Sequence, residues 1–416
     1  MFTEYFKSPS RIRELRSRPG GALLEGFAEA LNRSGYSKSS ACDFIRAGEH
    51  FLCWTDQQGI TPADLNEVVI DRFVEHLNAC KCQGVSHLRM VAMVHGVRAF
   101  LAYQNGVDIT RAGCSTIALE QGSVLFFAFC QWMRDQRGTS DPTLFNYSIS
   151  LRSLLELVGD DPGKLDAQCL RQFVLMQSQI KGCSAAKTCT TALRMFIRFL
   201  VADGKCSAGL EASIPVLAHW RLSSLPRYLQ ADEVERVIAS CDSKVPAGKR
   251  DRAILLLLAR LGLRAGDVLR LRIADIDWKG AWICVSGKSK RQTLLPLTQE
   301  VGQAIVDYLQ QARPRTDSDT LFVRARAPFR AFASHCAISV IVERAMRRAG
   351  VTCPSRGAAH VLRHSAATSM LRHGASLQDI AAVLRHRSIT TTQIYAKVDV
   401  IALRQIAQPW PKEESC

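Results

Sequence analysis

The chain of 416 residues is long enough for two or three domains, and its 47% hydrophobic and 22% charged residues are those of a globular protein. Its net charge of +16 lies almost wholly in residues 221–416, which hold 31 Lys+Arg and 17 Asp+Glu, whereas residues 1–220 hold 23 Lys+Arg and 21 Asp+Glu. This concentration of positive charge indicates a polyanionic partner, most simply nucleic acid. The alternative is a charge that only aids solubility. The sequence has neither an apolar run of about 18 residues nor a signal-peptide core, which argues against a membrane or exported protein and favours a cytoplasmic one.

The N-terminal half has the apolar spacing of helices. Residues 1–20 form a basic segment, which we predict to be a mobile tail that can touch polyanions. A helical module is predicted over residues 21–110, and its third helix has a clear start because Pro62 follows the N-cap residue Thr61. The helices of this module are predicted at residues 24–35, 47–59, 61–77 and 87–106.

The chain contains 15 cysteines. Because no export signal precedes them, we expect reduced and mostly buried thiols rather than a disulfide framework. Cys80 and Cys82 form a C-x-C pair, but no second pair lies at the spacing of a zinc ribbon. We therefore expect no zinc ribbon in this half of the chain.

The order of helices recurs about a hundred residues later. DRFV at residues 71–74, for example, corresponds to RQFV at residues 171–174. We therefore predict a second helical module over residues 115–205 that repeats the first, with a chance similarity of helical composition as the alternative. Its helices are predicted at residues 124–138, 144–159, 164–179 and 184–204.

Residues 206–230, which are polar or small with two prolines, are predicted to be a linker, and residues 231–416 a domain of mixed type. In that domain two strand-like runs, at residues 281–287 and 292–298, are joined by the basic tip KSKR, which predicts a β-hairpin. Helical spacing is found around them at residues 231–241, 251–271, 298–312, 337–350, 360–374 and 377–386.

His360 and His364 lie four residues apart on one predicted helix, a spacing that can hold zinc in metalloproteases. Val361, however, stands where such a site needs its general-base glutamate, and Arg363 between the histidines would repel a cation. We therefore expect no metal at these histidines.

The remaining unusual polar residues of the basic half suit phosphoryl transfer without a metal. Two guanidinium groups can clamp the oxygens of one phosphodiester and stabilise the added negative charge of a pentacoordinate transition state. A histidine can accept the nucleophile's proton, a lysine can protonate a leaving alkoxide, and a tyrosine can attack phosphorus and hold it covalently. A structural role is the alternative for each residue taken alone. The residues are Arg264, Lys288, His360, Arg363, His386 and Tyr395.

The order of these residues resembles the tyrosine recombinase (phage integrase) family over about residues 225–405. The helical modules before them resemble the SAM-like core-binding domains of that family, with lower specificity. The resemblance implies a mainly α fold with a small antiparallel β-sheet, in which helical DNA-binding modules precede an α+β catalytic domain. Four boxes match in order and spacing: GLRAGDVLRLRIADID (262–277), VSGKSKRQTLLPL (285–297), HVLRHSAATSML (360–371) and VLRHRSITTTQIYAKV (383–398).

By this resemblance, Arg264 and Arg363 bind the scissile phosphate, and His386 donates a hydrogen bond to it. Tyr395 is then the nucleophile and forms a 3′-phosphotyrosyl link with the DNA. Because the link conserves the energy of the broken bond, neither ATP nor a metal nor any other cofactor is implied.

The resemblance also assigns the proton transfers. His360 assists the nucleophile, and Lys288 acts as general acid on the 5′ oxygen, with Lys290 on the same hairpin as the alternative.

Two positions depart from the usual pattern. Asp267 stands where relatives usually carry Glu, and we expect it to brace the site. Arg385 stands where LGH is usual, so it either reshapes the turn before His386 or adds a phosphate contact.

The implied partner is double-stranded DNA carrying a recombination site, and no membrane is involved. The implied assembly is a homotetramer on two DNA duplexes, with related recombinase subunits as further possible members. A predicted tail helix at residues 399–410 docks on a neighbouring subunit, or else on its own domain. The extra module at residues 21–110 would grip further DNA or mediate protein contacts.

We therefore expect a site-specific DNA recombinase that serves the integration, excision or transposition of a mobile element. One alternative is a type IB topoisomerase, which uses the same chemistry but reseals the strand that it cut. The other is a non-catalytic DNA-binding accessory protein, against which the intact residue set argues.

Overall fold

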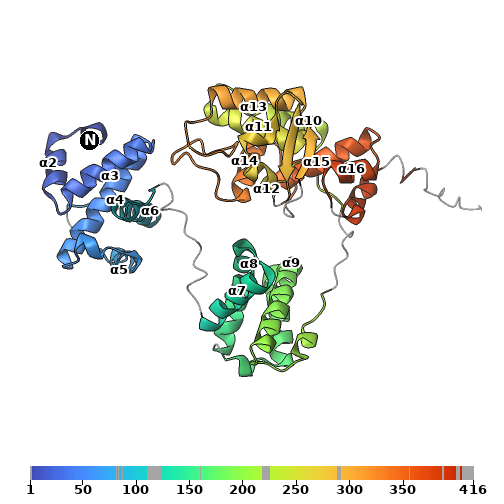
Figure 1. Ribbon diagram of the computed structural model, residues 1–416, viewed down its shortest axis with the longest axis horizontal. Helices are drawn as coiled ribbons and strands as arrows, with labels where there is room; N and C mark the ends of the chain where they lie inside the picture. Colours follow the sequence, from blue (N-terminus) through green and yellow to red (C-terminus); the bar gives the residue numbers. More distant parts are fainter. Residues whose placement is uncertain are drawn as a thin grey trace, which may run out of the picture. The chain divides into compact units, whose positions relative to one another are not determined.

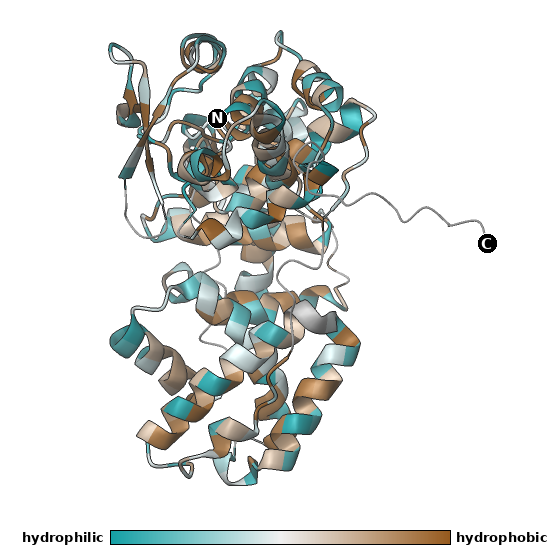
Figure 2. Cartoon of the chain, turned by 90° about the vertical axis from the view of Figure 1, so that its right-hand side faces the viewer, coloured by the Kyte–Doolittle hydropathy of each residue, from teal (hydrophilic) through white to brown (hydrophobic). Residues whose placement is uncertain are grey.

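The structure, a computed structural model, describes residues 2–109 except 81, 83 and 87, residues 123–217 except 160, and residues 225–399 except 288–291, 356 and 387, together with residues 403 and 404. These segments are mainly helical, with one three-stranded sheet (Figure 1). Most helices carry both polar and apolar residues and so have an apolar side to bury (Figure 2). Within the described segments, none of the helices has the length and apolar character that crossing a membrane requires.

The residue contacts divide the chain into two compact units, residues 115–221 and the remainder. The hydrophobic cores are more finely divided. One core lies within residues 2–109, a second within residues 125–214, and a third with a small satellite within residues 229–395. The three bodies are described in turn.

The N-terminal body is held together by buried aromatic rings. Phe27 meets Phe100 edge to face at 5.4 Å between ring centroids, and Phe51 meets Phe73 in the same way at 5.1 Å. Side-chain caps fix two helix starts, because Ser37 and Asn66 each accept a backbone N–H three residues on. The elements are α1 (Phe2–Tyr5), α2 (Pro9–Ser17), α3 (Gly21–Arg33), α4 (Lys38–Gln57), the 3₁₀ turn η1 (Pro62–Asp64), α5 (Glu67–Leu77) and α6 (Met90–Gln104).

The prediction of a mobile basic tail at residues 1–20 is wrong. Phe2 and Leu15, on α1 and α2, are fully buried in the N-terminal core. Arg11 and Arg18 of this segment form ion pairs with the buried carboxylate of Glu49 on α4. The basic side chains that indicated a polyanion-binding tail are therefore partly used within the protein, and apolar residues between them anchor the segment.

The second body has an order of elements similar to that of α3 to α6, with one kinked helix in place of α5 and α6. The elements are α7 (Val124–Arg137), α8 (Asp141–Val158), the 3₁₀ turn η2 (Pro162–Lys164) and α9 (Ala167–Ala202). Its 3₁₀ turn precedes a capped helix just as η1 precedes α5, which agrees with the predicted repeat. The two helices predicted at residues 164–179 and 184–204 form one element with a kink at Gly182, whose φ of 79° favours glycine.

The first part of the predicted linker belongs to this second body. Residues Leu210–Ser213 form the 3₁₀ turn η3, and Ile214 is buried in the core. Arg194 of α9 donates to the carbonyl oxygens of Ile214 and Pro215, both at 3.1 Å. These contacts extend the module beyond the boundary predicted at residue 205.

The C-terminal body is built around the apolar helix α11 (Pro246–Arg260), which packs against α13 (Gln299–Gln311) and α15 (Ala358–Arg372). The predicted hairpin is present as β2 (Trp282–Ser286) and β3 (Gln292–Pro296), paired antiparallel with Ile283 opposite Leu295. A short strand β1 (Ile276–Asp277), which was not predicted, pairs with β2 and completes the sheet in the order β1-β2-β3.

The remaining elements position the segments that carry the predicted site. The buried helix α15 supplies two of the predicted residues, and the turns after α11 and α16 supply two more. The predicted tail helix falls largely outside the described residues. The elements are α10 (Ala231–Ala239), α12 (Ala265–Arg270), η4 (Ile273–Asp275), α14 (His335–Arg348), α16 (Leu377–Val383), η5 (Ile389–Thr391) and η6 (Gln393–Val398).

Candidate active site

Arg264 lies at the turn between α11 and α12. Gly262, with a φ of 57°, lets the chain leave α11, and the Arg264 N–H donates to Asp267 Oδ2 at 3.2 Å where α12 begins. The Arg264 side chain is 40% exposed, and its Nη2 donates to the carbonyl oxygen of Arg385 at 3.3 Å. Arg264 therefore presents a positive charge to solvent from a turn that is fixed on both sides.

Asp267 is the carboxylate that fixes this turn. Its side chain is only 2% exposed, and it accepts from Arg270 Nη2 at 3.0 Å and from Arg385 Nη2 at 2.7 Å. A buried carboxylate is stabilised when several donors satisfy it. These contacts agree with the bracing role expected of Asp267.

The backbone conformation and contacts of Arg385 show how an arginine is accommodated where the family pattern has another residue. Its φ of 54° is in the left-handed region that favours glycine, the residue usual at this position in the family that the sequence resembles. The side chain is 9% exposed and points to Asp267. The structure thus shows a glycine-like turn in which Arg385 pairs with Asp267 through Nη2, while its Nε and Nη1 have no hydrogen-bond partner among the described residues.

Arg363 is the most deeply buried of the predicted residues, with 1% of its surface exposed on α15. Its Nη1 donates to the carbonyl oxygen of Gly262 and its Nη2 to that of Leu384. Burial first, and then the charges of Arg264 and Arg385, lower the pKa of Arg363 to about 9, so it remains protonated at neutral pH. One side chain therefore links the turns that carry Arg264 and His386.

Tyr395 lies on η6 with 2% of its surface exposed. Its Oη is 2.8 Å from Nδ1 of His364 on α15. Burial raises the pKa of Tyr395 to about 12, against the lowering effect of Arg363 and Arg264, and burial lowers the pKa of His364 to about 4. At neutral pH a protonated hydroxyl and a neutral imidazole therefore share this hydrogen bond.

The other two histidines flank this pair. His360 lies one turn before His364 on the exposed side of α15, and the two rings meet edge to face at 4.5 Å between centroids. His386 follows α16, and its Nδ1 is 2.7 Å from the hydroxyl of the buried Thr392. Burial, and then Arg363 and Arg264, lower the pKa of His386 to about 4.

The described residues thus place five of the six predicted side chains in one electrostatic neighbourhood, in which Arg264 and Arg363 act on both His386 and Tyr395. The sixth, Lys288, lies outside the described residues together with its rival Lys290. Guanidinium groups next to a tyrosine hydroxyl can bind a phosphodiester and direct that hydroxyl at phosphorus. The arrangement is suited to an anionic substrate and offers no carboxylate that is free for a cation.

Comparison with known proteins decides the family. Residues 227–400 match the phage integrase family. The predicted integrase/recombinase y4rA of Sinorhizobium fredii is 38% identical over 401 residues, which are 95% of this chain and 95% of that protein. The chain belongs to the phage integrase family.

Proteins named as tyrosine or site-specific recombinases are similar over most of this chain. Tyrosine recombinase XerD of Listeria monocytogenes is 28% identical over 67% of this chain and 95% of its own. A solved structure of the XerH site-specific recombinase is also similar, with a TM-score of 0.54 and 20% identity. It shows XerH bound to a palindromic difH substrate after cleavage, and the match covers 81% of this chain and 93% of the XerH chain. This phage integrase family member is a tyrosine-type site-specific DNA recombinase, an enzyme that cleaves and joins DNA strands.

The sequence did not predict one residue that contacts Tyr395. His364 was considered only as a zinc ligand, and assistance of the nucleophile was expected of His360, but in the structure the Nδ1 of His364 lies 2.8 Å from Tyr395 Oη. The spacing of four residues did signal that both histidines share one face of α15. It could not show which of them the η6 turn approaches.

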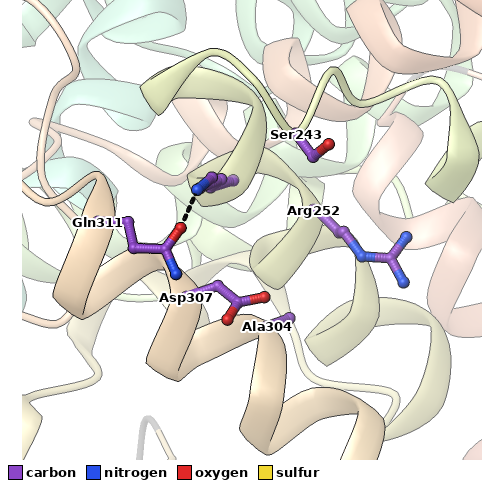
Figure 3. Close-up of a pocket in the computed structure, with 6 residues that line it drawn as sticks. Ser243, Arg252, Ala304, Asp307 and Gln311 are labelled. Atoms are coloured by element: carbon purple, nitrogen blue, oxygen red, sulfur yellow. Dashed lines mark hydrogen bonds between the residues drawn. The ribbon is translucent and has the colours of Figure 1, made fainter.

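A shallow polar pocket also lies in the C-terminal body of the recombinase, between α11 and α13. Figure 3 shows it from the side of Asp307 and Gln311. Lys249 Nζ donates a hydrogen bond to Gln311 Oε1 in this pocket. None of the residues that line it belongs to the predicted site, so we give it no part in the chemistry. They are Ser243, Lys249, Arg252, Ala304, Asp307 and Gln311.

Proposed function

We propose that this recombinase exchanges strands between two copies of a DNA site and thereby integrates, excises or transposes a mobile element. The observation that carries the proposed chemistry is the hydrogen bond from Tyr395 to His364 beside Arg363 and Arg264. The relative y4rA, similar over nearly the whole chain, carries the name integrase/recombinase, which supports the mobile-element role.

Phosphate binding is assigned to Arg264, Arg363 and His386. Arg264 is the exposed arginine and meets the phosphodiester first, while the buried Arg363 keeps further N–H groups beyond the two that bind carbonyl oxygens. A bound phosphate favours the protonated form of His386, whose pKa is lowered first by burial and then by the charges of Arg363 and Arg264. All three then stabilise the extra charge of the transition state.

The proton of the nucleophile passes to His364. As Tyr395 Oη attacks phosphorus, its proton moves to Nδ1 of His364, and the bond from phosphorus to the 5′ oxygen breaks. The 5′ oxygen takes a proton from Lys288, which we assign from the sequence. His360 packs on the ring of His364 and so positions this base. Attack by another 5′ hydroxyl reverses these steps and frees Tyr395.

Tyr395 is withheld before DNA binds. Its hydroxyl is buried, its pKa is raised to about 12, and it lies on short 3₁₀ turns rather than on a long helix. A short turn can shift at low cost, because few hydrogen bonds hold it. Movement of η6 toward a bound phosphate would therefore bring the nucleophile into use.

The number of strands that are exchanged determines the number of subunits in the proposed assembly. The chain offers one nucleophile, and exchange between two duplexes breaks four strands, so we propose a homotetramer on two duplexes, which related recombinase subunits could join. A palindromic substrate such as that of XerH, with two equivalent half-sites, supports two subunits on each duplex. The reaction takes place in the cytoplasm in this proposal.

The proposal is tested with a plasmid that carries two sites taken from DNA flanking the gene. Incubation with the full chain should give recombinant circles, and Tyr395→Phe should abolish them while the control Tyr147→Phe, in the second body, leaves them unchanged. Relaxation of supercoils without recombinant circles would instead support a topoisomerase. Bound but unchanged plasmid would support a DNA-binding accessory protein.

A further inference from the structure

Four metal-binding side chains meet in the N-terminal body, far in sequence from the recombinase site. His50 lies on α4, His76 in the last turn of α5, and Cys80 and Cys82 in the segment that follows. One ligand atom from each lies within 4.8 Å of all the others. We call these four residues the Cys–His cluster.

The donor atoms are close enough together to share one tetrahedral ion. Cys80 Sγ is 3.3 Å from His50 Nε2, and Cys82 Sγ is 3.3 Å from His76 Nε2. Zinc bonds of about 2.3 Å to sulfur and about 2.0 Å to nitrogen place neighbouring ligands roughly 3.3–3.8 Å apart around the ion. Small side-chain movements would therefore close the four donors around a single ion.

The charges of the cluster fit a buried cation. Two cysteine thiolates balance the two charges of Zn²⁺, and the two neutral imidazoles add none, so the complete site is neutral. A neutral group is cheaper to bury than an isolated ion. Sulfur and imidazole donors in a tetrahedron are also the combination that selects zinc over magnesium or calcium.

Aromatic rings hold the imidazoles in place. Phe73 meets His50 edge to face at 5.3 Å and stacks on His76 at 5.9 Å, and Trp54 packs on His76 at 5.7 Å. His50 is fully buried, and the other three members are half-buried. Such orientation of the ligand rings by packing lowers the entropy lost when a metal binds.

From this geometry we propose that the N-terminal body of the recombinase binds one structural zinc ion through His50, His76, Cys80 and Cys82. Four protein ligands complete a tetrahedron and leave no open position, so the ion has no catalytic role. It ties the segment after α5 to both α4 and α5. The same segment is held on its other side by Arg18, whose Nη2 donates to the carbonyl oxygen of Gly84 at 2.6 Å.

Only part of this signal is visible in the sequence. The C-x-C pair is recognisable, but two histidines complete the cluster in place of a second cysteine pair, and one of them lies 30 residues before Cys80. The cluster does not depend on the proposed function, because it lies in a different body from Tyr395.

The test is the metal content of the full chain. Protein stripped with a chelator and then dialysed against Zn²⁺ should retain one zinc ion per chain, measured by elemental analysis. With Co²⁺ in its place, the protein should show thiolate charge-transfer absorption and the visible bands of a tetrahedral site. The double variant Cys80→Ser/Cys82→Ser should lose both the zinc and the absorption, whereas Cys169→Ser/Cys206→Ser, half-buried thiols of the second body, should keep them.

The measurements on the wild-type protein test the zinc proposal even if the Cys80→Ser/Cys82→Ser variant does not fold. Wild-type protein that retains no zinc, or that shows no thiolate absorption with Co²⁺, overturns the proposal. A folded Cys80→Ser/Cys82→Ser variant that retains its zinc overturns it too, because the ion is then bound elsewhere. His76→Gln should weaken binding at least tenfold, while His95→Gln, at an exposed position of α6, should not change it.

Discussion

The cluster around α15 and the cluster between α4 and α5 are both built from histidines, yet their other members give them opposite preferences. Around α15, Arg264, Arg363 and Arg385 bring positive charge to the imidazoles, and these charges add to burial in lowering the pKa of His386. We call this group, with Tyr395 and its histidines, the arginine site. In the Cys–His cluster the neighbours are two thiols and aromatic rings.

The difference teaches that a histidine pair alone does not define a site. His360 and His364 stand at the spacing of a zinc pair, but Arg363 between them favours an anion. His50 and His76 lie in different helices, but two thiols beside them favour a cation. The chemistry follows from the charges that the fold brings to the imidazoles rather than from their spacing in the sequence.

If the anion preference of the arginine site depends on Arg363, the change Arg363→Lys should have a large effect. Lysine keeps the positive charge but cannot reach both carbonyl oxygens and a phosphate at once. DNA cleavage should fall by about 10³-fold, as expected for loss of a main transition-state contact. Arg372→Lys, on the exposed part of the same helix, should stay within about twofold. A folded Arg363→Lys protein with normal cleavage rates would contradict the assignment.

His364 should be the next most sensitive position. His364→Leu removes both the base and the acceptor for Tyr395, and cleavage should fall by about 10²-fold or more. His364→Asn keeps an acceptor near the place of Nδ1, so it should retain the position of Tyr395 but lose the acid limb of the pH–rate profile. The measurement is single-turnover cleavage against pH. An unchanged acid limb in His364→Asn would show that another group takes the proton.

Arg385 affects stability more than chemistry. Arg385→Ala loses the ion pair to Asp267, and the alanine still has the backbone strain of a non-glycine residue at positive φ. This change should destabilise the C-terminal body by about 2 kcal/mol. Arg385→Gly loses the same pair but relieves the strain, and should be roughly 1 kcal/mol more stable than Arg385→Ala. Chemical denaturation of both variants gives this difference. Equal stabilities would mean that the backbone at this turn is not strained.

The last prediction concerns the pH dependence of stability. The pKa values of His364 and His386 are about 4 in the folded protein, below the ordinary histidine value of about 6.5 in an unfolded chain. Between pH 6.5 and 4 the unfolded chain therefore binds more protons, and stability falls as the pH falls, by up to about 1.4 kcal/mol per pH unit for each histidine.

The double variant His364→Gln/His386→Gln should lack most of this slope, whereas His373→Gln, at an exposed position, should retain it. Thermal unfolding at a series of pH values measures both. Parallel curves for the double variant and the wild type would show that these histidines are not held neutral by the fold.

The sequence predicted the arginine site well because its residues occur in four boxes with a fixed order, and because the helix and hairpin patterns around them are strong. Arg264, for example, follows an apolar helix directly, and the structure confirms that helix as α11. The partner of Tyr395 was not predictable in the same way. Whether η6 approaches His360 or His364 depends on tertiary packing that the local pattern does not contain.

The N-terminal body shows the same limit. The basic residues at its start predicted a mobile tail, but a buried carboxylate, Glu49, pairs with two of them. A buried carboxylate inside an amphipathic helix cannot be told from an exposed one by sequence alone. The Cys–His cluster was likewise hidden, because His50 and Cys80 are neighbours only after α4 and α5 have packed together.

The most direct test of the account is to identify the residue that becomes joined to DNA. A nicked duplex that carries the recombination site and loses its short strand after cleavage should trap the covalent intermediate. Mass spectrometry of the digested protein should then place the nucleotide on Tyr395, and no adduct should form with Tyr395→Phe, while His364→Leu should form it slowly. An adduct on any other residue, or one that persists in Tyr395→Phe, would contradict the account.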